Sequence, residues 1–238
     1  MPAMSLSSLG LGDFNIVVTT DVHSWLDGHV HADQPYGQLA RTDATFGDVV
    51  ALLGHLRTAA SARGRDVFFF DNGDVVDGTG LSSATPVAGS AVFPLLGAMP
   101  YDAMNLGNHE LYNSQTVERD LLGSGFIAAR NGSYLTSNVD LAATGQAVGA
   151  RYTVREGRHG TRLLVFGFLF DMEVRTYPYS KLTAVTTRLP VRTNPVSPPP
   201  SHRPATPQRN TCGEAHYTPP LTIYAYMYLC IEQLYIYI

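Results

Sequence analysis

The chain has 238 residues, 45% of them hydrophobic, and a formal net charge of −4, which suits one sizeable α/β domain or a domain with an appendage. The negative charge argues against a binder of nucleic-acid polymers, because such proteins present a basic face. Both cysteines, Cys212 and Cys230, lie near the C-terminus, so a disulfide framework is excluded for the rest of the chain.

Residues 1–13 are small and polar, and we expect them to form a frayed lead-in. A secretory signal peptide has a basic segment followed by an apolar one. Neither is present in this stretch, so no signal peptide is predicted.

Three apolar runs, at residues 15–20, 66–70 and 102–106, predict strands buried on both faces. Each run is followed directly by polar residues that could build a site. Strand ends of this kind form the sites of open α/β sheets. The residues concerned are Asp21-Val22-His23, Gly73-Asp74-Val75-Val76-Asp77-Gly78 and Gly107-Asn108-His109-Glu110.

The remaining elements alternate with these strands. Apolar residues at helical spacing predict a helix over 46–62 that stops at Gly64. Further helices are expected over 86–98 and 115–122, and a strand over 134–137. An antiparallel hairpin is expected from the two runs 151–155 and 162–170, which flank a turn. This order predicts a mixed β-sheet with helices on its faces.

The sequence changes character after Leu189. Nine of the 15 prolines lie between residues 190 and 220, a pattern typical of disordered or polyproline segments. Residues 221–238 are apolar and rich in tyrosine, but Glu232 within the run argues against a membrane span. We therefore predict a domain over 14–189 and a tail over 190–238 that is disordered or not native sequence.

The polar residues after the three strands mix oxygen donors with imidazole, which suits Zn, Mn or Fe. Hydrolysis of a phosphate ester by two metals requires a carboxylate that bridges them, and Asp74 is the candidate. His109 follows a ligand directly and is predicted to protonate the leaving group instead. The predicted metal ligands are Asp21, His23, Asp74 and Asn108, with Asp77 and Glu110 supporting them.

The three blocks resemble the first three blocks of the calcineurin-like metallophosphoesterases, because they occur in the same order and each one follows a predicted strand. Trp25, Gly28-His29, the run from Asp77 to Ser82 and residues 134–138 are similar to the 5'-nucleotidase-like subgroup. The resemblance covers residues 12–175. It implies a sandwich of mixed β-sheets flanked by helices, two divalent metal ions, and hydrolysis of a small phosphate ester, most often a nucleotide. Relatives of this kind are often secreted or vacuolar.

The family pattern continues with a lone His and a Gly-His-x-His block, and nothing after Asn138 matches it. His159 falls in the expected hairpin turn, and His29 lies in the first loop, where it is either solvent-exposed or on the substrate side. Asn138 either reaches the site or ends its strand. The domain is thus expected to be incomplete at its C-terminus. The alternative function is a truncated, inactive remnant that binds at most one metal or a partner.

Overall fold

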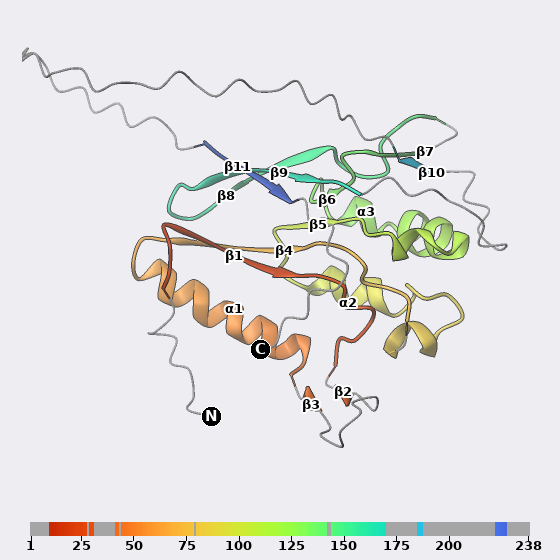
Figure 1. Cartoon of the computed structure of the whole chain (residues 1–238), viewed down its shortest axis with the longest axis horizontal. Helices are drawn as coiled ribbons and strands as arrows, with labels where there is room; N and C mark the ends of the chain where they lie inside the picture. Colours follow the sequence, from red (N-terminus) through yellow and green to blue (C-terminus); the bar gives the residue numbers. More distant parts are fainter. Residues whose placement is uncertain are drawn as a thin grey trace, which may run out of the picture.

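A parallel four-stranded sheet lies at the centre of the protein (Figure 1). The structure, a computed structural model, describes residues 10–27, 44–78, 80–141 and 144–169, and the backbone alone of 29–30, 41–42, 185–187 and 222–227. The strand order is β1 (Phe14–Thr19), β4 (Asp66–Asp71), β5 (Ala103–Asn105) and β6 (Tyr134–Leu135). All neighbours are parallel, so the predicted site residues all follow strands that end at one edge of the sheet.

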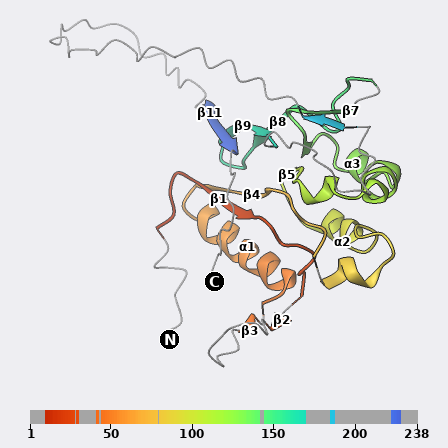
Figure 2. The ribbon, with the colours of Figure 1, turned by 45° about the vertical axis from the view of Figure 1, so that its right-hand side comes forward.

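Two helices, α1 (Phe46–Ser61) and α2 (Val92–Ala98), cover one face of this sheet (Figures 1 and 2). Phe69 of β4 is buried in the cluster that includes Leu53 and Leu96 of these helices. The start of α1 is fixed by a capping box, in which the Thr45 side chain accepts from the Asp48 N–H and the Asp48 carboxylate accepts from the Thr45 N–H. The predicted helix over 46–62 is confirmed.

A second sheet covers the opposite face (Figure 1). Its order is β11 (Thr222–Met227), β9 (Arg162–Gly167) and β8 (Tyr152–Glu156). β8 and β9 form the predicted antiparallel hairpin, whereas β11 runs parallel to β9. Phe68 and Phe70 point to this side and pack with Leu163 and Val165. Alternate residues of β4 therefore fill two cores, which confirms an α/β sandwich with mixed strand directions.

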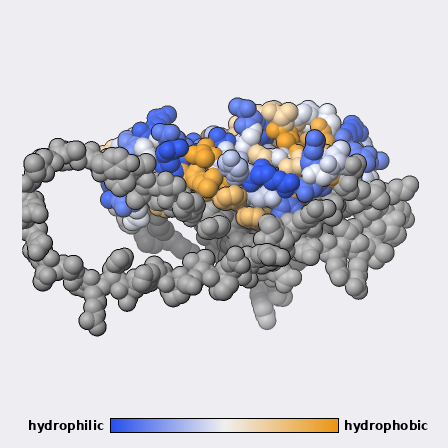
Figure 3. Space-filling model, turned by 90° about the horizontal axis from the view of Figure 1, so that it is seen from above, coloured by the Kyte–Doolittle hydropathy of each residue, from blue (hydrophilic) through white to orange (hydrophobic). Residues whose placement is uncertain are grey.

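Shorter elements complete the fold. β2 (His29–Val30) pairs with β3 (Arg41–Thr42), and β7 (Val139–Leu141) pairs with β10 (Val185–Thr187), both antiparallel. The helix α3 spans Phe126–Ala129, and 3₁₀ helices span Gly80–Ala84 and His109–Leu111. Seen from above, apolar and hydrophilic side chains are interspersed on the visible described surface (Figure 3).

The structure corrects several sequence predictions. The second helix begins at Val92 and not at residue 86. With this start Pro94 lies in the first helical turn, where no N–H is needed, whereas a start at residue 86 would place it in the interior. The segment expected to be an α-helix over 115–122 is a π-helix, Thr116–Gly123. The predicted strand over 134–137 is only Tyr134–Leu135.

The expected tail lies mostly outside the described residues. Within it, Thr222–Met227 is a strand, in a segment expected to be disordered. Just before the tail, Val185–Thr187 is also a strand and belongs to the predicted domain. No helix in the described part of the chain is both long and apolar enough to cross a membrane.

Candidate metal centre

The loops that follow β1 and β4 run alongside each other and are joined through their backbones. The N–H groups of Asp21, His23 and Ser24 donate to the carbonyl oxygens of Gly73, Asp74 and Val75 at 3.1, 3.0 and 2.9 Å. This ladder continues the pairing of the two strands beyond the sheet. It places the first two predicted blocks next to each other.

Both loops use left-handed backbone conformations. Asp21, His23, Ser24, Asp74 and Asp77 have φ angles of 53°, 42°, 67°, 57° and 75°. They make up five of the six non-glycine residues with positive φ in the described part of the chain. Such a conformation costs on the order of 1–3 kcal/mol per residue and concentrates at functional sites. The ladder between the two loops is what holds these residues in place.

The third loop approaches so closely that only glycine fits at the contact. A Cβ on Gly73 would lie 2.4 Å from the Gly107 nitrogen, and a Cβ on Gly107 would lie 2.2 Å from both the backbone nitrogen and Oδ1 of Asp74. Real Cβ atoms do not approach other atoms this closely. The two glycines therefore let the third block meet the second.

Glu110 ties these two loops together. Its side chain is fully buried, and its carboxylate oxygens accept N–H groups from Asp74, Val75, Val76 and Gly107 at 3.1, 2.7, 3.3 and 2.7 Å. Burial, followed by the negative charge of Asp74, raises the pKa of Glu110 to about 8. The sequence predicted a supporting role for Glu110, and its contacts are those of a residue that shapes the site.

Three of the predicted site residues converge. The candidate ligand atoms of His23, Asp74 and His109 all lie within 4.8 Å of one another, and the two imidazole rings meet edge to face with centroids 4.3 Å apart. Burial raises the pKa of Asp74, and the charge of Asp21 raises it further. Two imidazoles and a partly buried carboxylate, with a second carboxylate near, are a donor set that fits a divalent transition metal.

His109 also contacts residues around the cluster. Its Nδ1 lies 3.1 Å from Oδ2 of Asp77, and its backbone N–H donates to Oδ1 of Asp74 at 2.9 Å. The amide nitrogen of Asn108 donates to the Tyr112 hydroxyl at 2.5 Å, so the amide oxygen is the atom of Asn108 that could face a cation. Asp77 is thus in a position to orient His109.

Several of the predicted residues are not part of this group of three: the predicted ligand Asp21 lies outside it, and so do Asn138 and His29. Asn138 is buried, and its side chain bonds both the N–H and the carbonyl of Leu169, at 2.9 and 2.5 Å. It connects the end of β6 to the chain that follows β9. His29 begins β2, but its side chain lies outside the described residues. His159 lies in the β8–β9 turn, where its N–H donates to Asp66 at the start of β4.

Two serines to which the sequence assigned no role join the loops around the cluster. The hydroxyls of Ser24 and Ser82 bond each other, and Ser82 also accepts the Asp77 N–H at 3.1 Å and donates to the Ala88 carbonyl at 3.0 Å. This arrangement locks the loop that carries Asp77 to the first loop. Serine in a glycine-rich loop gives no signal that distinguishes it from a solvent-exposed residue.

The sequence reasoning also gave no role to Asp71, the last residue of β4. Its carboxylate is fully buried and accepts the Thr19 hydroxyl at 2.6 Å and the Gly73 N–H at 3.0 Å; the Tyr101 hydroxyl lies 2.8 Å from the Thr19 hydroxyl. Burial raises the pKa of Asp71 to about 7. A carboxylate that ends an apolar strand is the sequence signal that could have identified it.

The raised pKa of Asp71 should make the metal-free protein less stable as pH rises. Between the ordinary pKa of 3.8 and about 7, the folded chain keeps a proton that the unfolded chain has lost, so stability falls through this window. Each pKa unit corresponds to about 1.4 kcal/mol. As pH rises from acid to neutral, the free energy of unfolding of the Asp71→Asn variant should therefore increase by up to about 4 kcal/mol relative to that of the unmodified chain.

Urea unfolding in a chelator at several pH values measures this effect. The exposed Asp13→Asn change, which alters the same functional group, is the control and should show no such gain. Parallel pH profiles for the unmodified chain and Asp71→Asn would contradict the assignment.

A hollow of about 350 Å³ opens beside the cluster. Asp77 and His109 line it on the side of the cluster. The hydroxyl of Thr116, buried to 1% exposure, finds no partner among the described residues. The other residues that line the hollow are Val76, Ala88, Tyr112, Asn113 and Thr116.

The profile of the family described as calcineurin-like phosphoesterase matches residues 14–216. The chain belongs to this family. The resemblance inferred from the three blocks is therefore confirmed, together with the fold class of this phosphoesterase.

Several fungal proteins are similar to this phosphoesterase. An uncharacterized protein of Schizosaccharomyces pombe is 34% identical over 169 residues, or 70% of this chain and 27% of that protein. A protein named only as secreted, from Arthroderma benhamiae, is 34% identical over 164 residues, or 67% of this chain and 23% of that protein. The phosphoesterase chain thus spans about a quarter of the length of these relatives.

Solved structures give the same architecture. A 5'-nucleotidase from Candida albicans superposes with a TM-score of 0.61 and 30% sequence identity, covering 76% of this chain and 31% of that one. A 5'-nucleotidase precursor from Thermus thermophilus superposes with a TM-score of 0.52 at 23% identity, covering 74% and 32%. The second similarity supports the fold alone.

Proposed function

We propose that this chain is a metal-dependent phosphomonoester hydrolase that acts on nucleotides. The observation that carries the proposal is the convergence of His23, Asp74 and His109 at the ends of β1, β4 and β5. Its membership of the calcineurin-like phosphoesterases and its similarity to the Candida albicans 5'-nucleotidase support the choice of substrate class. A nucleotide is a small phosphate ester, which suits the hollow beside the cluster.

In this proposal the metal is held by Asp21, His23 and Asp74, and Asn108 contributes to a second metal position. Zn, Mn and Fe are the ions that such oxygen and imidazole donors favour. When bound, the ions polarise the phosphoryl group and lower the pKa of a water molecule. The other steps belong to the side chains around them.

His109 is proposed to donate a proton to the leaving-group oxygen. Because Nδ1 lies 3.1 Å from the Asp77 carboxylate, Asp77 can accept the Nδ1–H and stabilise the imidazolium, which leaves Nε2 to carry the mobile proton. The hollow beside His109 is where the leaving group would lie. Its buried Thr116 hydroxyl offers that group a hydrogen bond.

The proposal is tested by metal content and turnover of the full chain. We expect elemental analysis to find bound divalent metal, and we expect hydrolysis of AMP and p-nitrophenyl phosphate that a chelator abolishes and Zn²⁺ or Mn²⁺ restores. Bis(p-nitrophenyl) phosphate, a diester, should be turned over more slowly.

The alternative is a truncated, inactive remnant that binds at most one metal or a partner. One observation favours it: in the described part of the chain, the clustered His and Asp ligands form one group of three. Three protein ligands suffice for one zinc ion. If the chain binds one metal ion and shows no turnover with Zn, Mn or Fe, this alternative is correct.

A further inference from the structure

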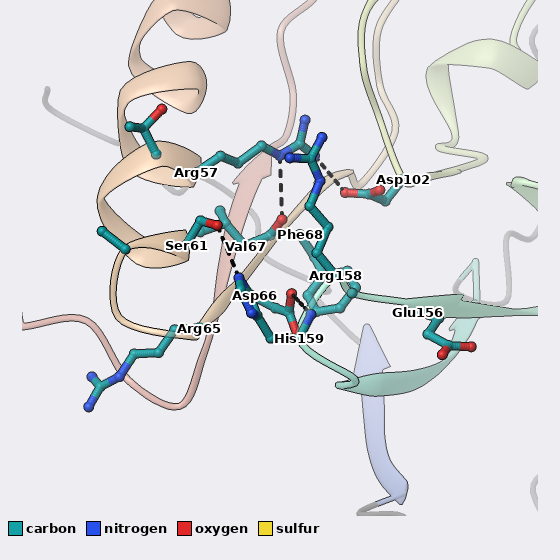
Figure 4. Close-up of a pocket in the computed structure, with 13 residues that line it drawn as sticks. Arg57, Ser61, Arg65, Asp66, Val67, Phe68, Asp102, Glu156, Arg158 and His159 are labelled. Carbon is teal, nitrogen blue, oxygen red and sulfur yellow. Dashed lines mark hydrogen bonds and ion pairs between the residues drawn. The ribbon is translucent and has the colours of Figure 1, made fainter.

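A second, larger hollow of about 730 Å³ lies at the other end of the sheet (Figure 4). Its walls are the C-terminal half of α1, the first residues of β4 and the turn between β8 and β9. β4 separates it from the metal centre, because the hollow lies at Asp66 and the centre follows Asp71. At about 3.3 Å per residue, the five steps between these residues span roughly 17 Å. The hollow is therefore a separate site.

One buried carboxylate in the lining of the hollow already has its hydrogen-bond partners within the chain. Asp66 is buried and accepts the N–H groups of His159 and Thr161 at 3.0 and 3.2 Å. Gly157 packs against it so closely that a Cβ there would lie 2.2 Å from the carboxyl carbon. These contacts fix the β8–β9 turn and hold Arg158 at the rim of the hollow.

Three arginines line the hollow: Arg57, Arg65 and Arg158. Arg57 pairs with Asp102 at 3.0 Å and donates to the Val67 carbonyl at 3.5 Å, which holds its guanidinium in place. Arg65 donates to the backbone carbonyl of Leu11.

Arg158 makes no hydrogen bond or ion pair with any other described residue. In the view of Figure 4 its side chain extends toward Arg57, while Glu156 points away from both. A guanidinium that forms no ion pair in the described part of the chain thus lines the same hollow as Arg57, whose guanidinium is already positioned.

Hydrogen-bonding side chains lie beside the arginines, and the carboxylates of Asp102 and Glu156 also line the hollow. Nε2 of His159 lies 3.1 Å from the Ser61 hydroxyl, and both side chains line the hollow. Guanidinium groups bind phosphate through charge-assisted, often paired, hydrogen bonds. Hydroxyl and imidazole groups add further hydrogen bonds to such an anion.

We propose that this hollow binds the terminal phosphate group of a small ligand, with Arg158 and Arg57 as its principal contacts. The phosphate belongs either to inorganic phosphate or to a phosphate monoester such as a nucleotide. Binding here is independent of the metal centre and of the proposed hydrolysis. Arg158 supplies a guanidinium that forms no ion pair with a described carboxylate.

The test is calorimetric titration of the full, chelator-treated chain with inorganic phosphate and, separately, with AMP. We expect saturable binding that Arg158→Glu weakens at least about tenfold, the effect of losing one charge-assisted hydrogen bond. Arg158→Ala should weaken it less. Arg119→Glu makes the same charge change on a side chain that is 69% exposed and away from the hollow, and it should leave affinity within about twofold.

Asp74→Asn separates the two sites, because it changes the metal centre and should not alter phosphate binding. Equal affinities for phosphate and AMP would show that the phosphate group alone is recognised. If AMP binds more tightly than phosphate, and Arg158→Glu removes this difference, the ligand is a nucleotide. The proposal fails if no saturable binding occurs, if Arg158→Glu and Arg119→Glu behave alike, or if Asp74→Asn abolishes binding. Circular dichroism of each variant verifies that it is folded.

Discussion

The Asp74→Asn variant is expected to fold normally but to bind divalent metal at least about a hundredfold more weakly than the unmodified chain. Changing a residue that only supports a ligand already costs about 10–100-fold in affinity, and Asp74 is proposed as a ligand itself. Asparagine keeps the size of the side chain and an oxygen that can accept the His109 N–H, now at 2.9 Å. The substitution therefore removes charge with little change in shape.

The same variant should be at least as stable as the unmodified chain when no metal is present. The charge of Asp74 contributes to the raised pKa of the buried Glu110 beside it, so removing it relieves a like-charge repulsion. We expect the free energy of unfolding of the metal-free variant to be higher by about 1 kcal/mol. A site that costs stability until its ligand binds is common where function requires clustered charge.

Equilibrium dialysis against Zn²⁺ and thermal melts in a chelator measure the two effects. The exposed Glu118→Gln change is the control and should alter neither metal affinity nor melting temperature. Unchanged Zn²⁺ affinity in Asp74→Asn would refute the metal centre. A variant that melts well below the control in a chelator would show that Asp74 is mainly structural.

Gly107→Ala is expected to destabilise the protein by about 2–4 kcal/mol and to disrupt the metal centre. The new methyl group would lie 2.2 Å from the Asp74 nitrogen and 2.7 Å from Oε2 of Glu110. The second and third loops would have to separate, which breaks the hydrogen bonds that Glu110 accepts. Buried carboxylate oxygens without donors add to the cost.

The matched control is Gly97→Ala in α2, where the nearest atom to the added Cβ would be a Phe126 ring carbon at 4.0 Å. Alanine favours helices over glycine by about 1 kcal/mol, so this control should be neutral or stabilising. For a chain of this size the Gly107 variant should melt roughly 5–15 °C lower. Thermal melts that place both alanine variants together would show that the close approach of the loops is not maintained in solution.

The sequence was a good guide where burial and spacing determine structure. The runs ending at Asp71 and Asn105 are strands because both faces of each strand are covered, and this leaves continuous apolar sequence. The run ending at Thr19 is an edge strand whose residues are only partly buried, with Ile16 41% exposed, so the predicted burial on both faces is wrong there. Helical spacing of apolar residues identified α1, and two runs that flank a turn identified the β8–β9 hairpin. Polar residues directly after those strands then had to share one edge of the sheet, which is why His23, Asp74 and His109 could be predicted to converge.

The sequence was a poor guide where backbone geometry is set by tertiary contacts. The residue types of Asp74 and His23 do not indicate a left-handed φ, because that conformation is held by the backbone hydrogen bonds between the loops that follow β1 and β4. The π-helix at Thr116–Gly123 buries Val117 and Leu121 as an α-helix would, so apolar spacing does not distinguish the two. The hollow beside Arg158 combines residues from three separate elements, which no local pattern predicts.

The contacts of Glu110 have a consequence for how an ion would arrive. The four N–H groups that converge on this carboxylate hold the neighbouring loops in one arrangement without any cation. The loops therefore lose their conformational entropy when the chain folds, and not when the ion binds. The rate of capture should then depend on how fast the incoming ion sheds its own water, and hardly on movement of the protein.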